Sequence, residues 1–134
     1  MAAIHVRRGD YAKTSLGGQS WLLPASYYHD ALERIPKDAG VAVFSDEPDW
    51  AAAEFAHRNP WVSRNNSAAL DMYLIGRCRW NIIANSTLSW WAAWLNEQPD
   101  KIVIAPQYHL GWRVGRWAPG GIDVPSWHYL NVRS

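Results

Sequence analysis

Cysteine is almost absent from this sequence of 134 residues, which contains only Cys78. A single cysteine excludes a disulfide within the chain and a zinc site built from several cysteines, and it suits a reducing compartment. Four of the five histidines, at positions 29, 57, 109 and 128, lack the spacing of metal ligands. We therefore expect no metal and no cofactor, and the cytoplasm is the expected location.

Net charge is also nearly absent, because the charges of 13 Lys and Arg residues are almost balanced by those of 12 Asp and Glu residues. This balance gives no global field that would attract nucleic acid or an anionic membrane surface, so any anion site has to be local. No apolar run approaches the roughly 20 residues of a membrane-spanning helix, and the amino terminus lacks the order of a secretory signal. We expect a soluble chain without a nucleic-acid partner, and membrane association only through segments outside it.

Three common catalytic motifs are missing: the GxSxG elbow, the GxxxxGK[ST] loop and the GxGxxG loop. Their absence removes the usual support for a hydrolase or an NTPase. The length suits one compact domain covering residues 1–134. Since only Met1 and Ala2 precede the first strand-like run, we expect this domain to be part of something longer.

Short apolar runs alternate with amphipathic segments along the chain. The expected strands are 3–7, 41–44, 61–63, 81–84 and 101–105, and the expected helices are 27–35, 48–58, 68–78 and 87–97. Ser26 is the expected N-cap of the first helix, and the tail after Pro106 has no clear period. Continuous apolar strands separated by helices predict a Rossmann-like α/β fold, with a parallel sheet of about five strands and helices on both faces.

Polar clusters follow three of these strands, at the edge where ligands of open parallel sheets bind. In HVRRGD, Arg7 and Arg8 can each grip phosphate oxygens with two parallel hydrogen bonds. Strand alternation places His5 with Arg7 on one face and Arg8 with Asp10 on the other. One arginine could then face a ligand while its neighbour pairs with Asp10. The alternative is that both arginines form surface salt bridges.

The other two clusters each allow a structural and a functional interpretation. Asp46 in FSDE could accept hydrogen bonds from a nucleoside, but capping of the next helix is the favoured interpretation. Asn85, Ser86 and Thr87 open a helix whose free N–H groups suit a diphosphate, and capping explains only one of these side chains. The stripe formed by positions 90, 91, 94 and 95 (Trp, Trp, Trp, Leu) is expected to be helix core.

The segments HVRRGDY, FSDE with Trp50, and DMYLIGRCRWNIIANSTLSWWAAWL resemble the sequence blocks of the α-1,2-fucosyltransferases, glycosyltransferase family 11. The resemblance runs in order from His5 to Pro106, and VPSW near the carboxyl end also matches. It implies a GT-B enzyme whose carboxyl-terminal half binds GDP-fucose without a metal. The chain would be this donor-binding half, and the amino-terminal half, with its Gly-Asn-Gln loop, is absent.

The resemblance also implies roles for individual residues. Arg7 and Arg8 would hold the diphosphate, and Asp46 would lie near the guanosine. Asn85, Ser86 and Thr87 would line the phosphate side. In an inverting transfer a general base takes the proton of the attacking hydroxyl, and His5 and Asp10 are the candidates in this chain.

The expected function is thus inverting transfer of L-fucose from GDP-fucose to a hydroxyl of a galactoside acceptor in glycan biosynthesis. Two positions depart from the family, Trp80 in place of histidine and Glu47 in place of aspartate. One alternative is a non-catalytic carbohydrate- or nucleotide-binding domain that stacks sugars on exposed Trp112, Trp117 and Trp127. The other is an inactive truncated fragment.

Overall fold

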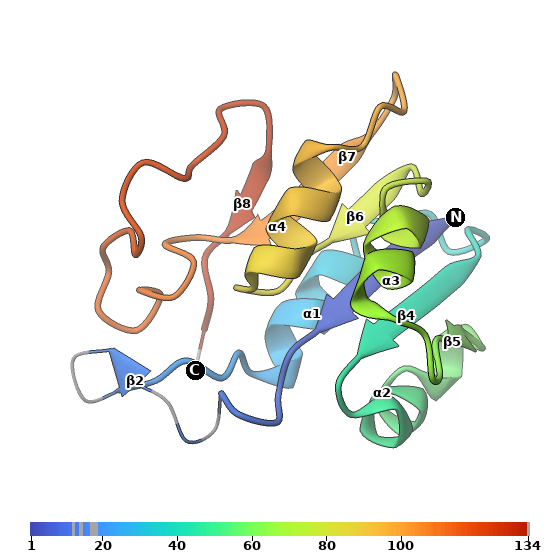
Figure 1. The fold of residues 1–134 in the computed structure, drawn as a ribbon, viewed down its shortest axis with the longest axis horizontal. Helices are drawn as coiled ribbons and strands as arrows, with labels where there is room; N and C mark the ends of the chain where they lie inside the picture. Colours follow the sequence, from blue (N-terminus) through green and yellow to red (C-terminus); the bar gives the residue numbers. More distant parts are fainter. Residues whose placement is uncertain (12, 14, 17–18, 134) are drawn as a thin grey trace.

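The computed structural model describes residues 1–11, 13, 15–16 and 19–133, and its centre is one parallel sheet of six strands (Figure 1). The strands are β1 (Ala2–Val6), β4 (Val41–Ser45), β5 (Trp61–Val62), β6 (Trp80–Ile82), β7 (Ile102–Pro106) and β8 (His128–Leu130). Their order across the sheet is β5-β4-β1-β6-β7-β8. The register places Ile4 of β1 beside Val43 of β4 and Ile82 of β6.

Helices cover both faces of this sheet, as the alternation of apolar runs predicts (Figure 1). They are α1 (Ala25–Leu32), α2 (Pro48–Glu54), the 3₁₀ helix η1 (Ala56–Arg58), α3 (Ala68–Ile75) and α4 (Thr87–Trp94). Ile4 of β1 packs in one core cluster with Tyr27 of α1 and Ala51 of α2. Ala3, on the opposite face, packs in a second cluster with Ile75 of α3 and Ala92 of α4. A separate small hairpin pairs β2 (Ser15–Leu16) with β3 (Gln19–Ser20).

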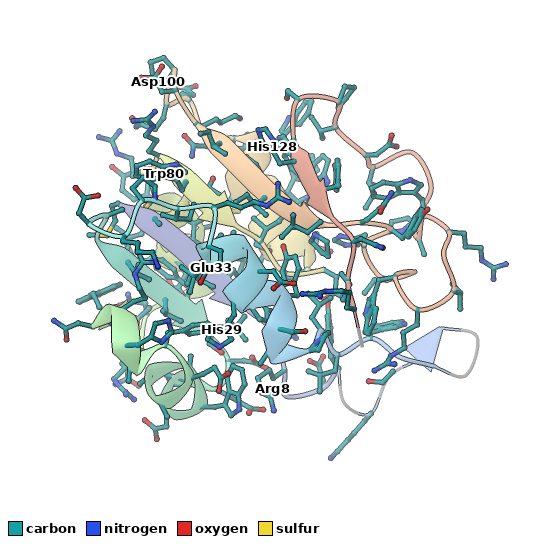
Figure 2. All side chains as sticks on the ribbon, turned by 180° about the vertical axis from the view of Figure 1, so that it is seen from behind. Arg8, His29, Glu33, Trp80, Asp100 and His128 are labelled. Carbon is teal, nitrogen blue, oxygen red and sulfur yellow. The ribbon has the colours of Figure 1, made fainter. Side chains whose placement is uncertain are left out.

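The strand order defines where a ligand can enter. The chain runs outward from β1 through β4 to β5, and then crosses back to place β6 on the other side of β1. This is the doubly wound order of Rossmann folds, in which the crevice lies outside the carboxyl ends of the two strands where the direction reverses. The loops after β1 and β6 therefore flank the switch point. Figure 2 shows Arg8, after β1, at the edge opposite Trp80 and Asp100.

The structure corrects several expected boundaries. β8 is a sixth strand in the tail, and three residues are too few to give a recognisable pattern. Pro24 is the N-cap of α1, while Ser26 lies inside the helix and its hydroxyl donates to the Arg133 carbonyl at 3.2 Å. The second helix breaks at Phe55 into the separate turn η1, which ends at Asn59 with a left-handed backbone (φ 48°).

The expected tryptophan core of α4 is wrong. Trp91, Trp94 and Leu95 are 46%, 51% and 59% exposed, and Trp90 is only partly buried, against Trp127. The residues that face the sheet are instead small: positions 89, 92, 93 and 96 (Ser, Ala, Ala, Asn) are buried. These residues have the same spacing of three and four, so periodicity alone could not choose between the two stripes. Small side chains let the helix approach the sheet closely.

The tail tryptophans do not form an exposed stacking surface, which removes the basis of the carbohydrate-binding alternative. Trp112 and Trp127 are 8% and 6% exposed, and Trp117 is partly buried between Tyr108 and Tyr129. Trp112 packs in the core cluster that contains Tyr27, and Trp127 packs in a third cluster with Ala93 of α4. Among the residues described, none of the helices has the length and apolar character needed to cross a membrane.

Candidate functional site

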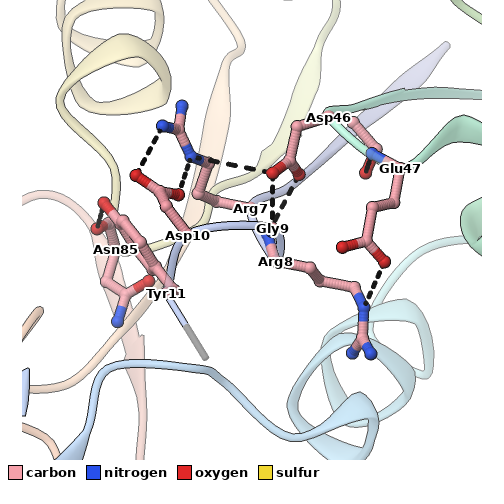
Figure 3. A network of polar contacts seen from close by, with 9 residues as sticks. Arg7, Arg8, Gly9, Asp10, Tyr11, Asp46, Glu47 and Asn85 are labelled. Atoms are coloured by element: carbon pink, nitrogen blue, oxygen red, sulfur yellow. Dashed lines mark hydrogen bonds and ion pairs between the residues drawn. The ribbon is translucent and has the colours of Figure 1, made fainter. Parts of the chain in front are cut away.

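Arg7, the first residue after β1, forms a two-pronged ion pair with Asp10. Its Nε and Nη2 atoms donate to the two carboxylate oxygens at 3.0 and 3.1 Å (Figure 3). This hydrogen bond raises the pKa of Arg7 and lowers that of Asp10, so both groups are charged at neutral pH. The predicted pairing of Asp10 with Arg8 is wrong, because the strand ends at Val6 and its alternation no longer applies to the loop.

Arg8 points to the other side of the same loop. Its guanidinium lies 3.9 Å from the centroid of the Trp50 ring, and its Nε is 3.4 Å from Glu47 Oε1. Trp50 and Glu47 belong to the start of α2, whereas Figure 3 shows Arg7 on the side of Tyr11 and Asn85. The structure therefore brings Arg7, and not Arg8, toward the switch point.

Asp46 connects the loop after β4 to the loop after β1. Its two carboxylate oxygens accept main-chain hydrogen bonds from Arg8 at 3.0 Å and from Gly9 at 2.7 Å. The favoured interpretation of Asp46 as a helix cap is wrong, because Glu47 is the N-cap position of α2 and has no capping side-chain bond there. The Asp46 carboxylate instead fixes the backbone from which Arg7 and Arg8 project.

Asn85, Ser86 and Thr87 connect β6 to α4 on the other side of the switch point. Asn85 is 1% exposed, and its side-chain Nδ2 donates to the Trp21 carbonyl at 2.8 Å. Its main-chain carbonyl accepts a hydrogen bond from the Tyr11 hydroxyl at 2.9 Å. Its Oδ1 has no hydrogen-bond partner in the described part of the chain. Ser86 is the N-cap residue of α4 without a capping side-chain bond there, and Thr87 is exposed. The first turn of α4 thus presents N–H groups that Ser86 does not cap.

His5 and Asp10, the two candidate bases, differ in access. His5 is 6% exposed on β1, and burial, followed by the positive charge of Arg7, lowers its pKa to about 4 against a smaller opposing effect of Asp46. It is therefore neutral at pH 7. The Asp10 side chain is 56% exposed and reaches solvent while bonded to Arg7. Of the two groups, the Asp10 carboxylate is the one exposed to solvent.

A cavity of about 290 Å³ adjoins the loop after β6, and sequence reasoning did not predict it. One wall is α4, with Trp90 and Trp91, and the facing wall is the connection from β7 to β8, with His109, Leu110 and Ile122. Asn85 and Thr87 also line it. The connection has no hydrophobic period, and the one sequence signal was its density of glycine, proline and tryptophan.

Comparison with known proteins decides the family. The sequence profile described as Glycosyl transferase family 11 matches residues 1–129. The chain belongs to glycosyltransferase family 11. Family 11 enzymes have the GT-B architecture, which agrees with the Rossmann-like sheet, so both the recognition of the family and the expected fold are confirmed. No solved structure matches the chain.

Two curated relatives in family 11 are from Escherichia coli. The chain is 42% identical over 113 residues to the O-antigen biosynthesis glycosyltransferase WbnK, a match that covers 78% of this chain and 37% of that protein. It is 32% identical over 119 residues to an alpha-1,2-colitosyltransferase, covering 78% of this chain and 39% of the relative. The chain thus spans less than two fifths of the length of each relative.

The two positions at which the resemblance implies a departure from the family lie at different edges of the sheet. Trp80 begins β6 at the edge opposite the switch point, where Arg79 lies 4.8 Å from its ring centroid (Figure 2). Glu47 lies at the switch-point edge and pairs with Arg8. Among the described residues, no group of three or more His, Cys, Asp and Glu side chains could hold a metal ion. Metal independence stays a prediction.

Proposed function

We propose that this chain is the donor-binding part of a galactoside α-1,2-fucosyltransferase and that it binds GDP-fucose at the switch point between β1 and β6. The single observation that supports this most is the position of Arg7 and the first turn of α4 on the two strand ends that flank this point. A guanidinium and free helix N–H groups are the two groups best suited to a diphosphate. The reaction is an inverting transfer of L-fucose to a hydroxyl of a galactose-containing glycan.

In this proposal the charge on the departing GDP is stabilised without a metal. Arg7 contacts the phosphate oxygens directly, and the N–H groups and hydroxyls of Ser86 and Thr87 bind them from the other side. Arg8 contributes a more distant positive charge, because its guanidinium is held over Trp50. The Asn85 side chain supports the loop through its bond to Trp21.

The guanosine lies toward the start of α2, beside Asp46 and Glu47. Both Asp46 oxygens already accept main-chain N–H groups, so we assign Asp46 the task of holding the loop on which the nucleotide rests. In this proposal Asp46 lies near the base, and its role is to position Arg7.

Asp10 is the proposed general base. As the acceptor oxygen forms its bond to the anomeric carbon, the bond from that carbon to the phosphate oxygen breaks and GDP leaves with the electron pair. The proton of the acceptor hydroxyl passes to the Asp10 carboxylate, which is ionised and exposed. His5, the second candidate, is enclosed beneath the loop, and we assign it a structural role next to Arg7.

The two relatives support the proposed α-1,2 linkage and the proposed role in glycan biosynthesis. One is an alpha-1,2-colitosyltransferase and the other takes part in O-antigen biosynthesis, so an α-1,2 linkage in a surface glycan is the proposed product here. The chain covers less than two fifths of these relatives, and the acceptor is proposed to bind mainly to regions that lie outside it.

Calorimetric titration of the folded chain with GDP-fucose, GDP and UDP-galactose tests the proposal. GDP-fucose and GDP should bind at micromolar to millimolar concentration, and UDP-galactose should bind more weakly. A chain that gives a cooperative thermal melt but does not bind GDP or GDP-fucose at millimolar concentration would refute the proposed donor site.

A further inference from the structure

The cavity between α4 and the β7–β8 connection has apolar side chains on both of its walls. Trp90 and Trp91 on one wall face Leu110 and Ile122 on the other, and all four present apolar surface. Its volume of about 290 Å³ is at the lower end of the roughly 300–1,000 Å³ typical of small-molecule sites. It can hold a single sugar ring but not a whole nucleotide sugar.

Polar side chains also line this cavity. Asn85 lines it, and its buried Oδ1 has no hydrogen-bond partner among the described residues. His109 also lines it and is 7% exposed. Burial lowers the pKa of His109 to about 4, so its neutral imidazole can both donate and accept a hydrogen bond at pH 7.

The wall formed by the connection is held in a defined position. Tyr108 and His109 both adopt left-handed backbone angles, with φ of 70° and 55°, although neither is glycine. Such conformations cost free energy and persist only where surrounding contacts impose them. The His109 N–H donates to the Pro106 carbonyl at 3.1 Å, and the Trp90 indole N–H donates to the Ile122 carbonyl at 3.1 Å. The second bond ties the connection to α4.

The location of the cavity limits what it can contain. Thr87, at the start of α4, belongs both to the proposed phosphate site and to the lining of the cavity, and Asn85, which supports the loop before it, also lines the cavity. The sugar of a nucleotide sugar is bonded directly to the second phosphate. Once the diphosphate is bound at the first turn of α4, the sugar has to lie within one bond of it, and the cavity begins at that point.

We propose that this cavity holds the sugar ring of the donor and that the β7–β8 connection selects a sugar with an apolar edge, as in a 6-deoxyhexose. The methyl group at C6 packs against Leu110, Ile122 and the α4 tryptophans, and the ring hydroxyls face Asn85 and His109. This inference rests on the proposed function, because it takes the donor site as given. It adds the segment that distinguishes one nucleotide sugar from another.

The experiment compares GDP, GDP-L-fucose and GDP-L-galactose, which differs from GDP-L-fucose only by a hydroxyl on C6. In calorimetric titrations the unaltered chain should bind GDP-L-fucose about 10-fold more tightly than GDP-L-galactose. Leu110→Asn and Ile122→Asn should each remove most of this preference and leave the affinity for GDP within about twofold. The matched control is Val114→Asn, an exposed position of the same connection that does not line the cavity, and it should keep the preference.

The results separate the two proposals. Equal affinity of the unaltered chain for both nucleotide sugars, or an unchanged preference in both cavity variants, would overturn the inference while GDP binding upholds the donor site. Absence of GDP binding would overturn the donor site and the inference together. If lactose binds the unaltered chain and Leu110→Asn abolishes this binding, the cavity holds the acceptor sugar, and the inference is wrong. Retained GDP binding also shows that each variant is folded.

Discussion

The Asp46 carboxylate accepts the Gly9 main-chain N–H at 2.7 Å, which ties the loop after β4 to the loop after β1 (Figure 3). The second carboxylate oxygen accepts the N–H of Arg8 at 3.0 Å. A negatively charged acceptor thus holds the backbone that carries both arginines. Charge-assisted hydrogen bonds are stronger than neutral ones. The contact therefore fixes the position of Arg7 through the loops after both β1 and β4.

Asp46→Asn should weaken GDP binding because the amide can accept from only one of the two N–H groups. We expect about a 5- to 10-fold loss of GDP affinity, corresponding to a net hydrogen-bond contribution of about 1 kcal/mol, and no change in the weak binding of guanosine. Titrations with both ligands measure this. Asp49→Asn, on the exposed side of α2, is the control and should have no effect. A parallel loss for guanosine would instead place Asp46 on the base.

Gly9→Ala should act on the same contact from the other side. A β-carbon at Gly9 would lie 2.8 Å from Asp46 Oδ2, which is too close unless the carboxylate moves away from its two donors. The expected result is a loss of GDP affinity similar to that of Asp46→Asn, and little further loss when the two changes are combined. Gly120→Ala is a matched control, because a β-carbon there meets no atom within 4 Å. Additive losses in the double variant would contradict a shared mechanism.

Tyr11→Phe should loosen the two loops that flank the switch point. The Tyr11 hydroxyl donates to the Asn85 carbonyl at 2.9 Å, which joins the loop after β1 to the loop before α4. We expect a decrease of about 1 kcal/mol in the free energy of unfolding, measured by urea denaturation. Tyr73→Phe, on the exposed side of α3, should leave stability unchanged. An unchanged stability in Tyr11→Phe would show that this bond contributes nothing.

Stability should decrease as the pH falls from about 6.5 to about 4, because burial lowers the pKa of both His5 and His109 from 6.5 to about 4. In this interval the unfolded chain binds protons that the folded chain does not, so acid favours unfolding. By pH 5 each histidine should have cost about 2 kcal/mol relative to pH 8, an order-of-magnitude value. Urea denaturation at both pH values measures it, and His109→Gln should reduce the difference. If the difference does not change in His109→Gln, His109 does not have a lowered pKa.

The sheet was predictable because its signal is local. Buried parallel strands consist of continuous apolar residues, and the runs before Arg7, Ser45 and Pro106 stand out from the polar segments between them. The face of α4 was not predictable in the same way, since Ala92 and Trp91 each belong to a stripe of helical spacing. The small residues face the sheet because the space between α4 and the sheet is too shallow for tryptophan side chains.

The sequence predicted which residues lie at the site, but it did not predict which of them contact each other. Strand ends placed Arg7, Asp46 and Asn85 at one edge, and the fold brings these three loops together there. The partner of Asp10 and the contact from Asp46 to Gly9 depend on loop conformations that no period encodes. The cavity wall at His109 depends on positive φ values at residues other than glycine, which sequence patterns do not indicate.

The most direct test of the donor site is the effect of Arg7→Ala on the binding of GDP compared with guanosine. Loss of a charged hydrogen bond to phosphate should cost about 1.5 to 3 kcal/mol for GDP, roughly 10- to 150-fold in affinity, and leave guanosine binding unchanged. Arg34→Ala, an exposed arginine in the turn after α1, should bind both ligands like the unaltered chain. Equal losses for GDP and guanosine in Arg7→Ala, or no loss for either, would contradict the assignment of Arg7 to the diphosphate.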